Sequence, residues 1–170
     1  LSRGLGDVYK RQPISSFEIV IGFVGASATK SLIVGSIILI TATFFAEVRI
    51  DHPFVMVFLL ILTCLTFSLF GFLIGILSEN FEQLQVIPLI VVTPLVFLGG
   101  SLYSIEMLPE FWQQISYFNP VVYLINGMRW AFYGVSDINI WTSVFTMLGF
   151  LLICIVSTIF ILTKGYRIKS

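Results

Sequence analysis

The sequence predicts an all-α integral membrane protein with four spanning helices, and with short re-entrant or interfacial helices between the third and the fourth. Of the 170 residues, 58% are hydrophobic and only 11% are charged. Soluble domains carry roughly 25% charged residues, so this chain has too little polar surface to be solvated by water alone. Its apolar residues also gather in runs of about 20 residues or more, the length that crosses a bilayer. We therefore expect membrane lipid to surround much of the chain.

Composition also argues against several classes of function. The formal net charge is zero, which gives no reason to expect a nucleic-acid partner. Cys64 and Cys154 lie in apolar runs, where we interpret them as small packing residues and not as a disulfide or a metal site. His52 is the only histidine, and we expect it to be solvated. The sequence has no Ser/His/Asp set and no Cys/His cluster, so we predict that the chain is not an enzyme and binds no metal and no cofactor.

Residues 1–12 are set apart from the fold prediction. Residues 7–12 read Asp-Val-Tyr-Lys-Arg-Gln, which matches the in-frame translation of the end of a common transposon-based sequencing adapter. The sequence also has no initiator Met. We interpret residues 1–12 as an adapter-derived artefact joined to residues 13–170. A genuine basic cytoplasmic segment is the alternative.

The first predicted span covers residues 17–46. Ser15 and Glu18 fit a capping box at its start. A helix of this length extends roughly 45 Å, which is longer than a hydrocarbon core. We therefore expect the part up to Lys30 to lie at or below the membrane interface, where the Lys30 side chain can reach the headgroups.

Residues 25–31 end in Lys-Ser, as a phosphate-binding loop does. The motif requires a glycine where this chain has Thr29, and it requires a preceding strand that a membrane segment does not supply. We reject a nucleotide site here. Any ATP hydrolysis must come from another polypeptide.

The second predicted span, residues 54–77, contains no charged residue and follows the polar turn 47–52. Gly71 and Gly75 form a GxxxG step, which permits close helix packing. Packing within the chain is the favoured use, and a dimer seam is the alternative. Residues 78–83 are predicted to form the next polar loop.

The third predicted span covers residues 85–104. It contains Pro88 and Pro94, and the Gly99-Gly100 pair follows them. Prolines are tolerated in a spanning helix when neighbouring groups bond the freed carbonyls. We expect a kinked helix that ends near the glycines.

Two shorter helices are predicted next, at 109–117 and 120–134. Pro109 suits the start of the first, and Asn119 with Pro120 suits the start of the second. Both are too short to cross a bilayer, so they are predicted to be interfacial or re-entrant. The aromatic residues of this region fit an interfacial belt, and packing between helices is an equal alternative. These residues are Phe111, Trp112, Tyr117, Phe118, Trp130 and Tyr133.

The fourth predicted span covers residues 140–163, and three cations follow it in the last seven residues. The positive-inside rule then places the C-terminus in the cytoplasm. Counting back through four crossings places 78–83 inside, and 47–52 and 105–139 outside.

Arg129 is the most suggestive ionisable residue, because an arginine at membrane depth needs a partner or water. Glu106, Glu110 and the carbonyls of the Gly99-Gly100 region are the expected partners. A structural role and a place on a transport path both stay open. The candidate residues for either role are Tyr103, Tyr123, Asn126 and Arg129.

The text TPLVFLGGSLYS at 93–104 is similar to a motif of type 2 ABC transporter permeases. Further similar segments lie at 108–112, 119–123 and 134–137, with Gly127 and Arg129 between the last two. The motif residues are Pro94, Gly99, Gly100, Pro109, Trp112, Asn119 and Pro120. Order and spacing agree over roughly 45 residues, and the flanks agree more loosely. The chain therefore resembles the C-terminal portion of such a permease.

The resemblance implies a six-span permease of the bacterial inner membrane that dimerises with a second permease copy. It also implies two copies of a separate ABC ATPase subunit, which bind ATP and Mg, and it implies export as the function. The four predicted spans would be the third to the sixth, so spans one and two and most of the coupling helix would be missing. The cytoplasmic segments left to contact the ATPase contain Ser15, Glu18, Glu79 and Glu82. A membrane subunit of a non-ABC assembly, or a small oligomeric channel, is the alternative.

Overall fold

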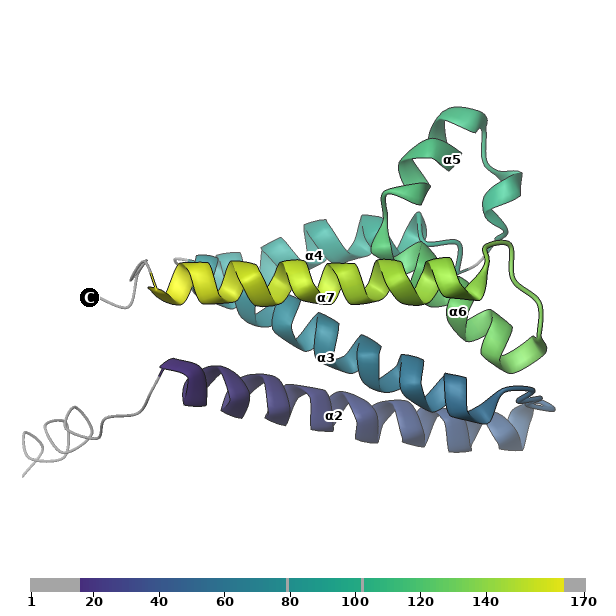
Figure 1. Ribbon diagram of the computed structural model, residues 1–170, viewed down its shortest axis with the longest axis horizontal. Coiled ribbons are helices and arrows are strands. Elements are labelled where there is room, and N and C mark those ends of the chain that lie inside the picture. The colour runs from purple at the N-terminus through teal and green to yellow at the C-terminus, as the bar shows by residue number, and fades with distance from the viewer. Residues whose placement is uncertain (1–15, 79, 102, 164–170) are drawn as a thin grey trace, which may run out of the picture.

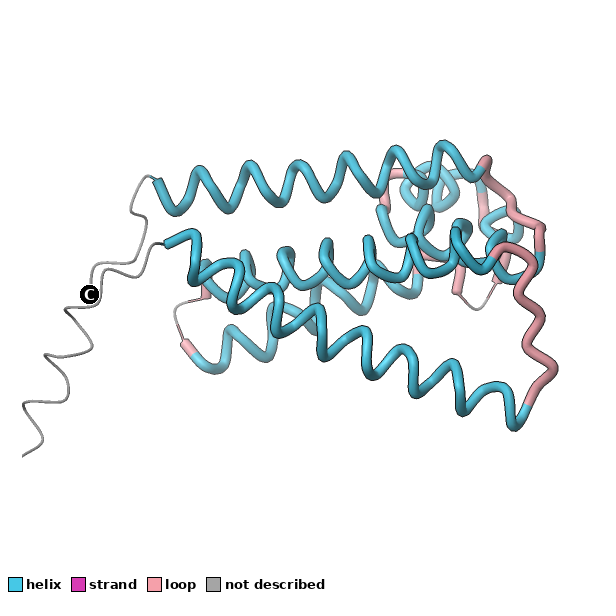
Figure 2. Tube along the Cα trace, turned by 60° about the horizontal axis from the view of Figure 1, so that its bottom comes forward, coloured by secondary structure: helices cyan, strands magenta, loops and turns pink. Residues whose placement is uncertain are grey.

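The computed structural model describes residues 16–78, 80–101 and 103–163 (Figure 1). Within these residues every regular element is helical, which confirms the all-α prediction, and the longer loops gather at one end (Figure 2). The α-helices are α2 (Ser16–Phe45), α3 (Pro53–Leu77), α4 (Phe81–Phe97), α5 (Glu110–Tyr117), α6 (Pro120–Tyr133) and α7 (Ile140–Thr163). A short 3-10 helix, η1 (Ile105–Met107), lies between α4 and α5.

Helix α3 is the centre of the bundle, because α2, α4, α6 and α7 all contact it. Towards one end of α3, Leu59 and Leu62 pack on Met147 of α7, and side chains of α6 close over them. Towards the other end, Leu69 and Leu73 pack on Cys154, and side chains of α2 join them. The core is therefore two small clusters along α3. Most of the remaining apolar surface points outward, as expected of a protein that is solvated by lipid.

Three helices, α2, α3 and α7, are long and apolar enough to cross a membrane. Their apolar segments have mean hydropathies of 1.8, 2.6 and 2.7 in that order. Helix α4 is apolar but has only 17 residues, which extend about 25 Å. The bounds predicted for the first, second and fourth spans agree with the structure to within one residue.

The predicted bounds of the third span, 85–104, differ from those of α4 at both ends, although the helix ends near the glycines as expected. The helix begins at Phe81, four residues before the predicted start, so Phe81–Gln83 belongs to the helix and not to the polar loop. Glu82 lies in the first turn, where a carboxylate favours helix formation because it faces the positive end of the helix dipole. The helix ends at Phe97, and the chain then turns at Gly100, whose φ of 76° favours glycine.

Helix α6 has the start and the end that the sequence predicts. The Asn119 side chain accepts a hydrogen bond from the Val121 amide, and Pro120 occupies the first turn. Gly134, with a φ of 70°, ends the helix in the left-handed conformation. The 14-residue helix is too short to span a bilayer, yet Val122 and Ala131 are fully buried. It therefore packs into the bundle against α3 and α7.

Contacts between α2 and α3 set the register of the two helices. The Phe23 ring lies 6.1 Å from the Phe72 ring, and a Cβ added at Gly35 would lie 3.5 Å from Leu60. In both pairs the two residue numbers add up to the same value, so one antiparallel register holds along the contact and places Lys30 level with Leu65 of α3. That Lys30 lies at or below the membrane interface stays a prediction.

The close helix packing of this chain involves Gly127 and not the GxxxG step. A Cβ added at Gly127 would lie 2.9 Å from Leu59 and 3.7 Å from Ser143, so α6 approaches both α3 and α7 closely. At Gly71 and Gly75 no described atom lies within 4 Å of an added Cβ. The expectation that these two glycines serve packing inside the chain was therefore wrong.

We predict that Gly127→Val lowers the free energy of unfolding by about 1–3 kcal/mol, because the added methyl groups overlap Leu59. Thermal unfolding of the purified protein in detergent measures the effect. Gly149→Val in α7 is the matched control, since no described atom lies within 4 Å of a Cβ added there. Equal losses for the two variants would contradict the role of Gly127.

Candidate functional site

The last turn of α4 leaves carbonyl groups that no helical amide can bond. In an apolar environment each unbonded carbonyl is costly. In this structure the Leu95 carbonyl accepts from Asn119 Nδ2 at 2.6 Å, and the Phe97 carbonyl accepts from the Tyr103 hydroxyl. The Gly100 carbonyl accepts from Arg129 Nη2 at 3.1 Å. We call this region the α4–α6 junction: residues 95–100 with Tyr103, Ser104, Asn119, Asn126, Arg129 and Asp137.

Asn119 joins two helices through its one side chain. Its Oδ1 accepts from the Val121 amide at 2.9 Å and so caps α6, while its Nδ2 donates to the Leu95 carbonyl of α4. The side chain is only 5% exposed. An aspartate would keep the cap and lose the donor, which is a physical reason for asparagine here.

Arg129 joins α6 to the segments on either side of it. Its Nη1 lies 3.0 Å from Asp137 Oδ2, and the side chains of this pair are 29% and 24% exposed. The same carboxylate oxygen accepts from Ser104 Oγ at 3.0 Å. Asn126, which is 1% exposed, accepts from the Asp137 amide and donates to the Val122 carbonyl. The guanidinium, the carboxylate and the amide thus form one connected network.

The structure corrects the partners predicted for Arg129. The Gly100 carbonyl is a partner, as expected of the Gly99-Gly100 region. Glu106 and Glu110 are not, and Asp137 bonds Arg129 instead. Sequence reasoning missed Asp137, although a signal was present: the left-handed Gly134 reverses the chain, so a residue shortly after it returns to α6.

Gly99 and Gly100 are both buried at the junction. A Cβ added at Gly99 would lie 2.8 Å from Val121 and 3.0 Å from Ile125, both on α6. Gly100 adopts a positive φ and packs on Ile105, which is 2% exposed. The glycine pair therefore lets the end of α4 lie directly against α6.

Helix α5 stands away from the bundle (Figure 1). The Tyr123 hydroxyl donates to the Tyr117 carbonyl at 2.8 Å, and Gln113 Nε2 donates to the Leu108 carbonyl at 2.7 Å. These bonds anchor α5 at its C-terminal end and at the turn before it. Tyr123 thus bonds α5, while Tyr103, Asn126 and Arg129 meet at the junction.

Five of the six aromatic residues of this region are exposed, as an interfacial belt requires. The exposed residues are Phe111, Trp112, Tyr117, Phe118 and Tyr133. Trp130 instead stacks on His52, with ring centroids 3.9 Å apart and 14° between the planes. His52 is therefore packed, and the expectation that it is solvated was wrong.

The α2–α3 loop is tied to the end of α6. The His52 amide donates to the Ala131 carbonyl at 2.9 Å, and the Asp51 amide donates to the Phe132 carbonyl at 3.2 Å. Both carbonyls belong to the last turn of α6, where helical partners run out. The backbone groups at both ends of α6 are therefore hydrogen-bonded by neighbouring residues of the chain.

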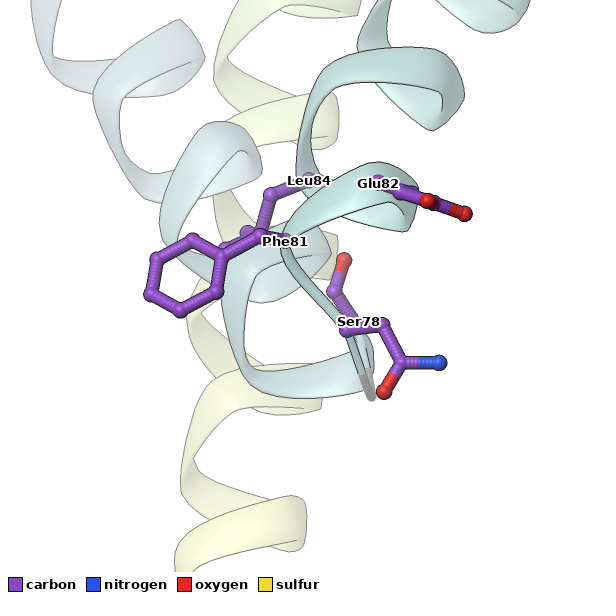
Figure 3. Close-up of a pocket in the computed structure, with 5 residues that line it drawn as sticks. Ser78, Phe81, Glu82 and Leu84 are labelled. Carbon is purple, nitrogen blue, oxygen red and sulfur yellow. The ribbon is translucent and has the colours of Figure 1, made fainter.

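The opposite end of the bundle holds the residues predicted to couple to an ATPase. Glu18 and Glu82 are exposed in the first turns of α2 and α4. Ser15 and Glu79 lie outside the described residues. Ser78, Asn80, Phe81, Glu82 and Leu84 line an open hollow of about 560 Å³. Figure 3 shows Phe81 and Glu82 pointing to opposite sides of the first turn of α4.

Comparison with known proteins identifies the family. The ABC-2 type transporter model matches residues 7–133, which is most of the chain. The chain belongs to the ABC-2 type transporter family. It is 38% identical over 147 residues to the inner membrane transport permease YadH of Escherichia coli K12, covering 84% of this chain and 57% of that protein. It is 28% identical over 126 residues to nodulation protein J of Rhizobium leguminosarum bv. viciae, covering 72% and 48%.

The chain thus spans about half the length of the curated relatives it matches. No solved structure is significantly similar to it. Together with its apolar helices, the relation to an inner membrane permease makes the chain a multi-pass protein of the bacterial inner membrane. Of the motif residues noted in the sequence, Gly99, Gly100 and Asn119 belong to the α4–α6 junction, and Pro94 and Pro120 are next to it in the sequence. Pro109 and Trp112 belong instead to the start of α5. That residues 1–12 are an artefact stays a prediction, since residues 1–15 lie outside the described residues.

We predict that Asn119→Ala lowers the free energy of unfolding by about 2–4 kcal/mol, because it removes a helix cap and leaves the Leu95 carbonyl unbonded. Asn139→Ala is the matched control. Asn139 caps α7 through a 2.9 Å bond from the Trp141 amide and is exposed, so its loss should cost only about 1 kcal/mol. Denaturation in detergent measures both. A smaller loss of unfolding free energy in Asn119→Ala than in Asn139→Ala would contradict the stabilising role of Asn119 at the junction.

We also predict that Arg129 and Asp137 are energetically coupled. A double-mutant cycle with Arg129→Gln and Asp137→Asn should give a coupling free energy of about 1–2 kcal/mol, since the pair is partly buried. The control cycle uses Arg49→Gln and Asp51→Asn. That pair is closer, at 2.7 Å, but the Arg49 side chain is 76% exposed, so coupling should stay below about 1 kcal/mol. Equal coupling free energies in the two cycles would contradict the prediction that the partly buried pair is coupled more strongly than the exposed pair.

Proposed function

We propose that this chain is the membrane permease part of an ATP-driven ABC exporter. In this proposal it forms the translocation path with a second permease copy, and it couples to two separate ATPase subunits that bind ATP and Mg. The observation that carries the proposal is the family match over residues 7–133, on a chain whose described helices are apolar enough for a membrane. YadH is named an inner membrane transport permease, which supports transport as the activity.

We propose that α2, α3, α4 and α7 are the third to sixth spans of a six-span permease. Helix α4 is the shortest of the four; it starts at the end of the bundle where α3 finishes and runs along the bundle as far as the start of α6 (Figure 1). Its exit through residues 98–100 adds length beyond the helix. The charge after α7 supports a cytoplasmic location for the end that carries Glu18 and Glu82, and so an external location for the junction.

The proposed mechanism is alternating access driven by closure of the ATPase dimer. A push at the first turns of α2 and α4 must become a movement of whole helices. Helix α4 is suited to pass on such a push, because its far end is bonded to α6 through Asn119 and Arg129. In this proposal α4 tilts about the junction, while α3 and α7 stay packed on each other.

The alternatives to an exporter are a membrane subunit of a non-ABC assembly and a small oligomeric channel. Family membership favours the exporter over both. ATP-dependent efflux from vesicles that contain the full-length permease and its ATPase partner tests the choice. Solute movement that is the same with and without ATP would favour a channel.

We predict that Glu82→Lys lowers permease-stimulated ATP hydrolysis severalfold, because it reverses an exposed charge on the proposed docking end. Glu18→Lys in α2 should act in the same direction. The matched control is Glu106→Lys, an exposed glutamate at the other end of the bundle, which should leave hydrolysis unchanged. ATPase activity in proteoliposomes measures all three. Unchanged hydrolysis in the Glu82 variant would contradict the docking role.

A further inference from the structure

The contact between His52 and Trp130 differs from the other ring pairs among the described residues. Its ring centroids lie 3.9 Å apart with 14° between the planes, so the imidazole is nearly parallel to the indole and close to it. The other pairs are tilted or edge-to-face, with centroids 5.6–6.5 Å apart. Two neutral rings prefer offset or edge-to-face arrangements with centroids roughly 4.5–7 Å apart. A close contact over the ring face instead suits a cation on a tryptophan.

Backbone hydrogen bonds hold the imidazole in this position. The His52 amide donates to the Ala131 carbonyl at 2.9 Å, and the Asp51 amide donates to the Phe132 carbonyl at 3.2 Å. The His52 carbonyl accepts from the Met56 amide at 3.0 Å and so begins α3. His52 therefore joins the start of α3 to the last turn of α6. We call these two bonds to α6, together with the ring contact, the α3–α6 clasp.

The charges near the clasp permit a positive imidazole. Helix α3 contains no charged residue. The other charged or titratable residues of the adjoining segments are Glu47, Arg49 and Asp51 in the α2–α3 loop, Arg129 and Tyr133 in α6, and Asp137 after α6. Each arginine lies within 3.0 Å of a carboxylate, Arg49 on Asp51 and Arg129 on Asp137. Their positive charges are therefore largely compensated and oppose a proton on His52 only weakly.

We propose that the α3–α6 clasp is sensitive to pH, and that a proton on His52 strengthens it. Histidine ordinarily changes its charge between pH 5 and 8. An imidazolium over the Trp130 indole is attracted to the negative ring face, an attraction that a neutral imidazole lacks. The clasp is therefore stronger in acid and weakens as the pH rises through this range. The α2–α3 loop joins two helices that are long enough to cross a membrane, so the clasp responds to the pH on one side of it. This inference goes beyond the proposed function and does not depend on it.

Hydrogen exchange of the Asp51 and His52 amides measures the clasp, because both amides exchange when their bonds to α6 open. Exchange is followed in the full-length protein in detergent at pH 5.5 and pH 8, and each rate is divided into that of an unstructured peptide at the same pH. This protection should be about threefold higher at pH 5.5, the value of a partly exposed cation–π contact. His52→Phe keeps a ring and an amide but takes up no proton, so its protection should be equal at both pH values. His52→Arg, which is positive throughout and stacks on aromatic rings, should be equally protected at both as well.

Two tryptophans give a matched pair of variants. Trp130→Leu removes the indole that lies against His52 and should abolish the pH difference in protection. Trp141→Leu removes an exposed indole of α7, whose ring contact is with Phe145 at 6.5 Å, and should retain the difference. Thermal unfolding shows whether each variant is folded. If Trp130→Leu does not fold, Trp130→Phe replaces it and should show a smaller pH difference than the wild type, because phenylalanine attracts a cation less than tryptophan does.

Three results would overturn the inference. A pH difference of the same size in the wild type and in His52→Phe would show that another group takes up the proton. A difference that is lost in His52→Phe but kept in Trp130→Leu would show that the proton acts through a carboxylate and not through the indole. Higher protection at pH 8 than at pH 5.5 in the wild type would show that the neutral stack is the stronger one. The measurements involve no ATP and no transported solute, so failure of the exporter proposal would leave them unchanged.

Discussion

The carbonyl groups at the last turn of α4 are the constraint on which the rest of the structure depends. A helix that ends within a membrane protein must have its terminal carbonyls bonded by other groups. Here Asn119 bonds the Leu95 carbonyl and Tyr103 bonds the Phe97 carbonyl, while Arg129 of α6 bonds the Gly100 carbonyl just beyond the helix. Gly99 lets the helices approach closely enough for these bonds to form. The motif residues Gly99, Gly100 and Asn119 thus allow α4 to end and the chain to re-enter the bundle.

Arg129 shows how the chain accommodates a charge at the junction. It lies at an end of the bundle and is neutralised within the chain by Asp137. Ser104 donates to the same carboxylate oxygen, and the Gly100 carbonyl accepts from the guanidinium. A charged group that is partly withdrawn from water needs such partners. The ion pair therefore joins the segment after α6 to the turn after α4.

The sequence predicted those features that depend on local patterns. The spans 17–46, 54–77 and 140–163, and the cap of α6 by Asn119 and Pro120, follow from run length and capping chemistry. What it missed depends on which segments meet in space. Asp137 as the partner of Arg129, and the stacking of His52 on Trp130, join residues that no local pattern links. The start of α4 was missed because polar residues suit both a loop and a first turn.

Within the described residues, α4 contributes least to the packed core. None of its residues is buried within the described chain, whereas α3 contributes to both core clusters. Its strong attachments are the polar bonds at its C-terminal end. A helix that is held at one end by hydrogen bonds and has few buried contacts along its length can rotate about that end at little cost in packing. A force applied at Glu82 would therefore tilt α4 about the junction before it separated α3 from α7, and the junction would act as the hinge of the movement.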